Sequence, residues 1–266
     1  MSIDLRVPGN LPVFPVIRPD WTGLPSNVRA FTTTRNGGFS VGAFGGDIGH
    51  GGLNLGDHVG DESSAVINNR RQLNKYLPSN AIFLSQIHGN IAIDVAKASS
   101  GGAADASFSS EKSLVCAVLT ADCLPVLFAD TQGTVVAAAH AGWRGLASGI
   151  LQETVQKMRS CGGDEIIAWL GPAIGPSQFE VGPDVLQAFC GVVNNAADYF
   201  IPKQVGNAGD EKYLADIYGL ARAVLLSEGI DRVSGGGHCT VTESDNFYSY
   251  RRDGVTGRMA SVIWMD

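Results

Sequence analysis

Three stretches of the chain repeat their apolar residues at the spacing of an α-helix. The first is the stripe Leu146, Ile150, Leu151, Val155 and Met158, which is followed by the stop Cys161-Gly162-Gly163. A second stripe runs from Leu214 to Leu225, with the acidic residues Asp210 and Glu211 before it and Gly229 after it. A third predicted helix covers about 63–77. These three segments are the helices that the pattern predicts.

Short apolar runs bounded by Gly, Pro, Asp or Ser predict strands at 81–86, 114–119, 125–128, 134–139, 166–170 and 260–264. The runs at 114–119, 125–128 and 134–139 follow one another too closely to leave room for crossover helices. The pattern therefore favours an α+β fold with mixed β-sheets over a doubly wound parallel sheet. Because no repeat, charge block or linker divides the chain, we expect a single compact domain over residues 1–266.

The charge balance of the chain argues against nucleic acids and anionic membranes as binding partners. The chain carries 19 Lys and Arg against 26 Asp and Glu, a formal net charge of −7, and only 17% of its residues are charged. A nucleic-acid groove or an anionic membrane surface needs a basic protein face, so we expect neither partner. Small molecules or other proteins remain, and the 34 glycines predict many tight turns.

The chain shows no sign of export or of membrane insertion. Its first ten residues include Asp4 and Pro8 and no apolar run, which is unlike a signal peptide. The most apolar stretches are far shorter than the ~18 residues that a membrane-spanning helix needs. The five cysteines are odd in number and form no C-x-x-C pair, which is typical of reduced thiols, so we expect a cytoplasmic protein.

Three residues at the ends of predicted strands form the strongest candidate for chemistry. They are His88 in SQIHG, Cys123 in TADCLP and His140 in AHAGWRG. Two imidazoles and a thiolate are sufficient to hold zinc with the fourth position open, and water bound there becomes acidic near neutral pH. Taken alone, each residue is better explained as an ordinary buried or hydrogen-bonded side chain, and only the three together favour a metal site. A Cys123–His140 nucleophile pair is another interpretation, and it leaves His88 unused.

Seven motifs carry a resemblance to a known family. They are FTTTRNGG at 31–38, LNLGDHVGD at 53–61, QIHG at 86–89, TADCLP at 120–125, HAGWRG at 140–145, GPAIGP at 171–176, and SYRRDG with TGR at 249–258. With them the chain resembles the YfiH/YlmD group of bacterial proteins, which is related to human laccase-domain-containing protein one. The motifs cover nearly the whole chain.

The resemblance implies an α/β/α-type domain with mixed sheets and a zinc ion held by His88, Cys123 and His140. It implies phosphorolysis of adenosine, inosine, guanosine and methylthioadenosine, together with deamination of adenosine. Two other activities attributed to the family are alternatives: copper-dependent oxidation of polyphenols, and an amidase acting on mis-assembled cell-wall precursors through a water on zinc or a Cys–His pair. Several coppers need more ligands than a chain with five histidines supplies, so zinc is favoured. A non-enzymatic role as a metal-bearing partner of division or wall-synthesis proteins is a third class.

The two implied reactions on nucleosides each suggest further residues. Phosphorolysis needs a cationic cradle for phosphate, and the candidates are Arg35 and Arg144, which lie beside glycines, and then Arg251. The alternative for Arg251, Arg252 and Arg258 is that they pair mostly with Asp231, Asp245 or Asp253 on the surface. Deamination needs a carboxyl group that moves a proton. Asp122 adjoins Cys123 and is one candidate, with Glu180 and Glu243 as alternatives, and a structural hydrogen-bonding role is favoured for Asp122. The expected substrates are purine nucleosides and phosphate.

Overall fold

The computed structural model describes residues 14–47, 51–203 and 211–266. The first ten residues and Asp210, which entered the predictions above, lie outside these ranges. Within them, strands and helices alternate irregularly along the chain. The α+β class with mixed sheets is therefore confirmed.

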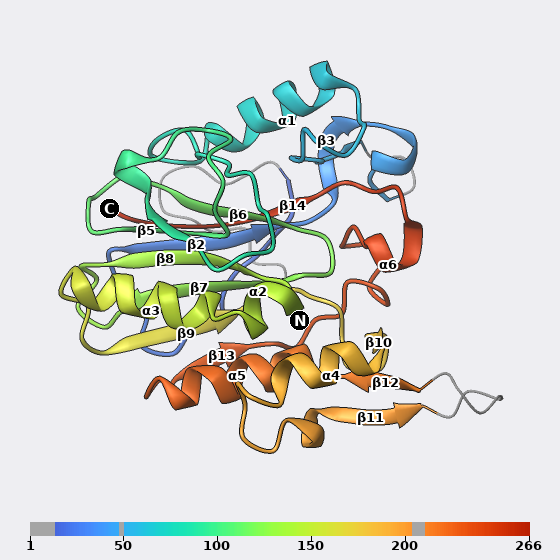
Figure 1. Ribbon diagram of the computed structural model, residues 1–266. Coiled ribbons are helices and arrows are strands. Elements are labelled where there is room, and N and C mark those ends of the chain that lie inside the picture. The colour runs from blue at the N-terminus through green and yellow to red at the C-terminus, as the bar shows by residue number, and fades with distance from the viewer. Residues whose placement is uncertain (1–13, 48–50, 204–210) are drawn as a thin grey trace.

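Two stacked sheets form the centre of the molecule (Figure 1). One has four antiparallel strands in the order β1 (Val16–Ile17), β2 (Val28–Thr33), β14 (Met259–Met265) and β6 (Cys116–Thr120). The other has six strands in the order β13 (Val233–Gly235), β9 (Ile166–Leu170), β7 (Leu124–Asp130), β8 (Val136–Ala141), β5 (Ala106–Ser109) and β4 (Ala92–Asp94). Its two outer pairs are parallel and its inner pairs antiparallel, so this sheet is mixed.

Helices cover the two outer faces of the stack (Figure 1). Helix α1 (Ser63–Asn74) lies over the four-stranded sheet, and the six-stranded sheet is covered by α2 (Trp143–Ala147), α3 (Ile150–Ser160), α4 (Pro183–Phe189) and α5 (Ile217–Ser227). The layers are thus helix, sheet, sheet, helix, with two sheet layers in place of the single one in the α/β/α arrangement that the resemblance implies. No helix in the described ranges is long and apolar enough to cross a membrane.

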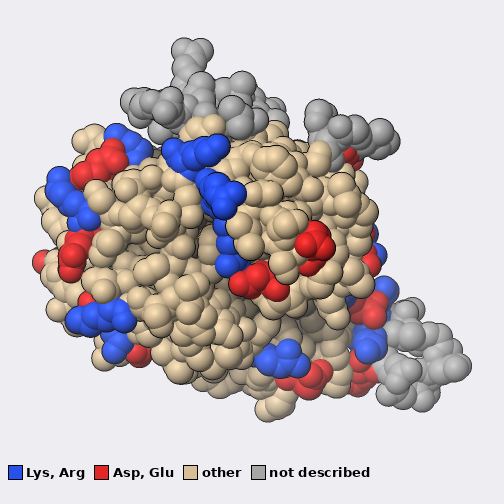
Figure 2. All heavy atoms as spheres, turned by 90° about the horizontal axis from the view of Figure 1, so that it is seen from above, with Lys and Arg blue, Asp and Glu red and all other residues tan. Residues whose placement is uncertain are grey.

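Smaller elements complete the chain. A three-stranded antiparallel sheet consists of β10 (Glu180–Val181), β12 (Lys212–Ala215) and β11 (Phe200–Lys203). The other short elements are β3 (Asn36–Ser40), helix α6 (Tyr250–Asp253) and the 3₁₀ turns Gly42–Phe44, Val95–Lys97 and Ala196–Tyr199. On the face above α1, a short row of basic side chains ends against acidic ones, and most of that face is uncharged (Figure 2).

The central strands alternate their side chains between two cores. In β7, Val126 and Phe128 pack with the helices below the sheet, whereas Leu127 and Ala129 pack against the four-stranded sheet. Because successive side chains point to opposite faces, a strand buried on both faces is apolar at every position. This explains why the predicted strands at 114–119, 125–128, 134–139, 166–170 and 260–264 read as continuous apolar runs.

The predicted strand at 81–86 is wrong. This segment is an irregular loop whose only ladder contact in the described chain is a bridge between Ser85 and Ala103. Phe83 and Leu84 are nevertheless buried. The side-chain amide of Gln86 donates to the Leu119 carbonyl at 2.7 Å and accepts from the Leu119 N–H at 2.7 Å. A side chain therefore makes the pair of bonds that a strand backbone would have made.

Two predicted helices have different limits in the structure. The stripe from Leu146 to Met158 is divided between α2 and α3, because Gly149 adopts φ +96°, which an α-helix cannot continue through. The second stripe becomes helical only at Ile217, where the Asp216 side chain caps the first turn by accepting from the Gly219 N–H. Leu214 lies before this cap, in β12, so its assignment to the helix is wrong.

Candidate metal centre

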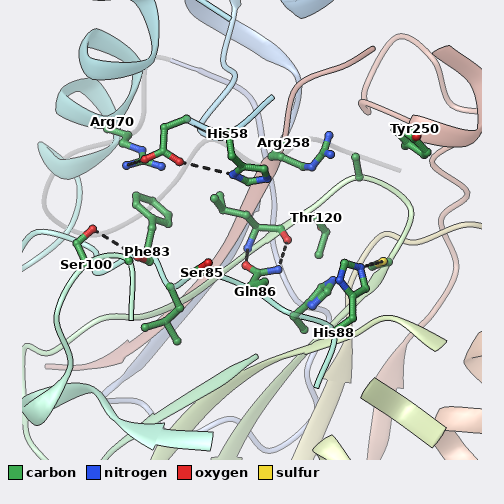
Figure 3. Close-up of a pocket in the computed structure, with 17 residues that line it drawn as sticks. His58, Arg70, Phe83, Ser85, Gln86, His88, Ser100, Thr120, Tyr250 and Arg258 are labelled. Atoms are coloured by element: carbon green, nitrogen blue, oxygen red, sulfur yellow. Dashed lines mark hydrogen bonds and ion pairs between the residues drawn. The ribbon is translucent and has the colours of Figure 1, made fainter. Parts of the chain in front are cut away.

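His88, Cys123 and His140 come together from three separate elements. His140 lies in β8 opposite Pro125 of β7, Cys123 lies in the connection between β6 and β7, and His88 lies in the loop after residue 86. One ligand atom from each residue lies within 4.8 Å of the other two. The Cys123 Sγ is 3.9 Å from the His88 Nε2, and the two imidazole rings are 4.8 Å apart and nearly perpendicular (Figure 3).

Strand periodicity explains the direction of His140. Val136 and Ala138 of β8 face the four-stranded sheet, and His140, two residues further along, lies on the same side of the strand. At this end of β8, His140 lines a pocket together with His88, Cys123 and Thr120, whereas Val136 and Ala138 are packed in the core. The ligand atoms therefore lie where the strand reaches the pocket.

Asp105 holds two of the three residues in place. It is fully buried beside β5, and its Oδ1 lies 2.8 Å from the His140 Nδ1 and accepts the His88 N–H at 2.9 Å. Its Oδ2 accepts the N–H groups of Ile87 at 3.2 Å and Gly89 at 2.8 Å. This arrangement fixes the His140 ring with its Nε2 free for the site, and it stabilises His88 in a left-handed conformation of φ +59°.

Asp122 points away from the three residues. Its φ of +83° breaks the strand between β6 and β7, so that Asp122 and Cys123 are not on opposite faces of one regular strand. The buried carboxylate accepts the Thr240 hydroxyl at 2.5 Å and the Arg251 backbone N–H at 2.6 Å. Asp122 thus joins the β6–β7 turn to the segments around residues 240 and 251.

The space between the three residues fits a metal ion. Two imidazoles and a thiolate are a donor set that suits zinc, and the half-buried Cys123 and the exposed His88 leave a further coordination position accessible. A Cβ built on Gly142 would lie 3.0 Å from the Cys123 Sγ and 3.2 Å from the His88 Cδ2. Only a residue without a side chain leaves this space free.

The electrostatics of the cluster favour a thiolate. Burial alone would raise the pKa of the Cys123 thiol, but the charge of His140 and hydrogen bonds from both imidazoles outweigh burial and lower that pKa to about 6. Burial also opposes charge on His140, but the Cys123 thiolate and Asp105 raise its pKa to about 9. In contrast, burial raises the pKa of the Cys116 thiol to about 12. Cys123 is thus ready to act as a ligand or a nucleophile.

The cluster forms one end of a pocket of about 850 Å³. This volume lies within the range of ~300–1,000 Å³ that is usual for small-molecule sites. Phe83, Leu84 and Leu119 form apolar parts of its wall. At the other end of the pocket, Arg70 forms an ion pair with Asp57 at 3.0 Å, and its guanidinium lies 4.6 Å from the centre of the Phe83 ring (Figure 3).

The three arginines predicted to hold phosphate are not among the described residues that line this pocket. The Arg35 guanidinium donates to the carbonyls of Gly45 and Ser244. Arg144 is exposed and lies over the Trp143 ring, at 4.4 Å from its centre. Arg251 donates to the Gln178 and Glu180 carbonyls.

Two other arginines, Arg70 and Arg258, line the pocket instead. Surface pairing with an aspartate is found for Arg252, which contacts Asp253 at 2.7 Å, whereas the guanidinium groups of Arg251 and Arg258 donate to carbonyls and form no ion pair among the described residues. Sequence reasoning missed Arg70 and Asp105. The one available signal for Asp105 is a lone acid within the otherwise small and apolar run AADAS at 103–107.

Comparisons with known proteins agree with this architecture. The family model described as "Multi-copper polyphenol oxidoreductase laccase" matches residues 29–266. A Haemophilus influenzae protein named purine nucleoside phosphorylase is 47% identical over 252 residues, covering 94% of this chain and 99% of its own. The Escherichia coli purine nucleoside phosphorylase YfiH is 49% identical over 259 residues, with coverage of 94% and 98%. The crystal structure of YlmD from Geobacillus stearothermophilus matches with a TM-score of 0.82 at 29% identity, with coverage of 94% and 96%.

Proposed function

This chain belongs to the multi-copper polyphenol oxidoreductase laccase family, and we propose that within it the protein is a zinc-dependent purine nucleoside phosphorylase that also deaminates adenosine. The observation that carries the proposal is the cluster of two imidazoles and one thiolate at the end of a pocket of about 850 Å³. The names of relatives at 47–49% identity support the phosphorylase activity. We expect the substrates to be purine nucleosides and phosphate.

His88, Cys123 and His140 would hold the zinc ion. When bound, zinc supplies Lewis-acid chemistry to an oxygen atom of a substrate. In the described ranges these three residues are the one group of three or more His, Cys, Asp or Glu that is arranged to hold a metal. Laccase chemistry needs several coppers, so a single cluster of this kind supports a zinc enzyme more strongly than a copper oxidase.

The protein's own residues shape the reaction. Asp105 keeps the His140 Nδ1 engaged and so directs the Nε2 toward the cluster. The apolar walls formed by Phe83 and Leu119 exclude water from one side of a bound nucleoside and offer surfaces against which a purine can pack. The polar group of Asp57 and Arg70 lies at the end of the pocket away from the cluster, within reach of the polar groups of a substrate.

The remaining sequence-based assignments stay predictions. Arg35, Arg144 and Arg251 are predicted to bind phosphate, and their guanidinium groups contact carbonyls or a ring outside the pocket. Asp122 is predicted to move a proton in deamination, and both of its oxygens already accept hydrogen bonds. These contacts also suit a purely structural role for Asp122.

Product analysis tests the proposal. The protein is incubated with adenosine or inosine, with and without phosphate, and the products are separated by chromatography. We expect free base and ribose 1-phosphate only when phosphate is present, and inosine from adenosine in either case. The Cys123→Ala variant should lose both activities, whereas Cys161→Ala, at an exposed cysteine outside the pocket, should keep them. Absence of all these products with the wild-type protein would rule the proposal out.

One observation favours a second candidate function. His140 has its Nδ1 2.8 Å from the Asp105 carboxylate and a ring nitrogen within 4.8 Å of the Cys123 Sγ, an arrangement of nucleophile, base and orienting acid that is typical of cysteine hydrolases. An amidase acting on cell-wall precursors would use the Cys123 thiolate to attack the amide carbon while His140 gives its proton to the leaving amine. Turnover of such amides that persists in a chelator and is abolished by alkylation of Cys123 would favour this candidate over the phosphorylase.

A further inference from the structure

Arg258 is half-buried, and only part of its guanidinium group donates hydrogen bonds to the described protein. It lies immediately before β14 and lines the pocket together with Cys123, His88 and His140. Its Nη1 donates to the carbonyls of Thr256 at 3.1 Å and Gly257 at 3.0 Å. In the described ranges, its Nε and Nη2 make no hydrogen bond, and no carboxylate lies within 4.0 Å to form an ion pair.

The loop at 54–56 holds Arg258 in a fixed position. The Arg258 N–H donates to the Asn54 Oδ1 at 2.9 Å, and its carbonyl accepts the Leu55 N–H at 3.1 Å. Gly56 packs against the side-chain stem, where an added Cβ would lie 2.8 Å from the Arg258 Cγ. The side chain is therefore held along its length, and the edge formed by Nε and Nη2 is available to a ligand.

The negative groups near Arg258 are already engaged. Cys123 and Asp122 both act on the guanidinium through space, and burial lowers its pKa. The Asp122 carboxylate, however, accepts hydrogen bonds from Thr240 and from the backbone N–H of Arg251. The Cys123 sulfur lies beside two imidazoles that compensate its charge. A partly buried cation whose nearest anions bind other groups favours the uptake of an external anion.

Thr120 provides a second, independent observation. It is 1% exposed at the end of β6 and lines the same pocket, and its hydroxyl has no hydrogen-bond partner among the described residues. Thr120 is paired with Met259, so it lies across from the residue that directly follows Arg258. In Figure 3, Thr120 lies between Arg258 and the His88 cluster. A buried hydroxyl without a partner is costly unless a ligand supplies one.

We propose that Arg258 and Thr120 form the subsite for a phosphate group, next to His88, Cys123 and His140. The free guanidinium edge offers two parallel N–H donors, which match two oxygens of a tetrahedral oxyanion, and the Thr120 hydroxyl offers a third donor. This inference rests on the proposed function, because there inorganic phosphate is the second substrate. It places phosphate on Arg258, a motif arginine ranked below Arg35 and Arg144 on the sequence alone, and on Thr120, which the sequence did not mark.

Binding of inorganic phosphate to the zinc-loaded protein, measured by calorimetry without nucleoside, is the first test. Arg258→Gln should weaken phosphate binding by at least ~10-fold, because it removes a charge-assisted bidentate contact. Thr120→Val should weaken it by a smaller factor without lowering the melting temperature, since valine removes the unpartnered hydroxyl. Arg71→Gln, on an exposed arginine outside the pocket, should bind phosphate as the wild type does. Unchanged phosphate binding in a folded Arg258→Gln variant, or in Thr120→Val if the first variant fails to fold, would overturn the subsite.

Steady-state kinetics separate this inference from the function that it rests on. In phosphorolysis, Arg258→Gln should raise the KM for phosphate by ~10-fold or more and change the KM for the nucleoside little. Phosphate binding that depends on Arg258 in a protein without nucleoside cleavage would contradict the function and keep the subsite. Phosphorolysis with an unchanged KM for phosphate in Arg258→Gln would support the function and contradict the subsite. If adenosine 5′-monophosphate binds more tightly than phosphate and depends equally on Arg258, the subsite serves a nucleotide instead, and the assignment to free phosphate is overturned.

Discussion

Replacing Asp105 by asparagine should remove hydrogen bonds that hold both the His140 ring and the loop of His88. The carboxylate accepts two N–H groups on each oxygen: His140 Nδ1 and the His88 N–H on Oδ1, and the N–H groups of Ile87 and Gly89 on Oδ2. An asparagine keeps one oxygen and replaces the other by an NH₂ group. Two of these four donors then face a third donor, so the support that holds the His140 ring and the His88 loop is weakened.

The size of the effect follows from these contacts. A buried donor left without an acceptor costs about 1–3 kcal/mol, and the N–H groups of residues 87–89 are only partly buried, so Asp105→Asn should lower the free energy of unfolding by about 1–3 kcal/mol. Residues that orient metal-ligating histidines typically change metal affinity by ~10–100-fold. We therefore expect zinc affinity to fall by that factor, measured by competition with a chromogenic chelator under conditions in which the variant is fully folded.

The matched control is Asp130→Asn. Asp130 is a second buried carboxylate, at the opposite end of β7 from Cys123, where it accepts the N–H groups of Thr134 and Val135. This variant loses a buried charge of the same kind and should retain wild-type zinc affinity. If Asp105→Asn binds zinc as tightly as the control, Asp105 is only a structural residue and the reasoning is refuted.

Three further predictions concern the same site and the fold around it. Gly142→Ala should lower zinc affinity at least ~10-fold in the chelator assay, because the new Cβ would lie 3.0 Å from the Cys123 Sγ; unchanged affinity would contradict the fit of a metal there. In metal-free protein, alkylation of Cys123 followed by peptide mass spectrometry should rise with pH around a midpoint of about 6, since only the thiolate reacts, and in His140→Ala the midpoint should move up. A midpoint that stays in place would show that His140 does not lower the pKa of Cys123. Gly149→Ala should lower the free energy of unfolding by about 1–2 kcal/mol, seen in urea titration, because Gly149 has φ +96°; no loss would mean that the chain tolerates alanine between α2 and α3.

The sequence predicts the central strands well for a simple physical reason. Strands buried on both faces, such as β7, have no polar side to interrupt their apolar run. Half-buried and short strands carry no such signal: β2 is mixed in polarity as VRAFTT, and β12 reads as KYLA. The apolar run at 81–86 is buried but irregular, because the Gln86 side chain bonds to the Leu119 backbone from a distant segment. The pattern of apolar and polar residues around 81–86 does not predict a contact with so distant a segment.

The candidate site shows the same limit. His88, Cys123 and His140 stand out because histidine and cysteine are rare in this chain, and the structure brings them together. Asp105 and Arg258 are defined by their partners, which lie far away in the sequence: Asp105 meets the segment at 87–89 and His140, and Arg258 is held by the loop at 54–56. An aspartate or arginine is common on any surface, so its type alone does not mark it. Only the fold distinguishes it from its neighbours.

Titration of metal-free protein with zinc tests the central claim most directly. Phosphorolysis of inosine is followed while zinc is added to a known concentration of chains. If His88, Cys123 and His140 hold the ion on which activity depends, activity should rise linearly and stop rising at one zinc per chain, and Cys123→Ala should show no such rise. Full activity before any zinc is added, or an identical titration in Cys123→Ala, would contradict the account.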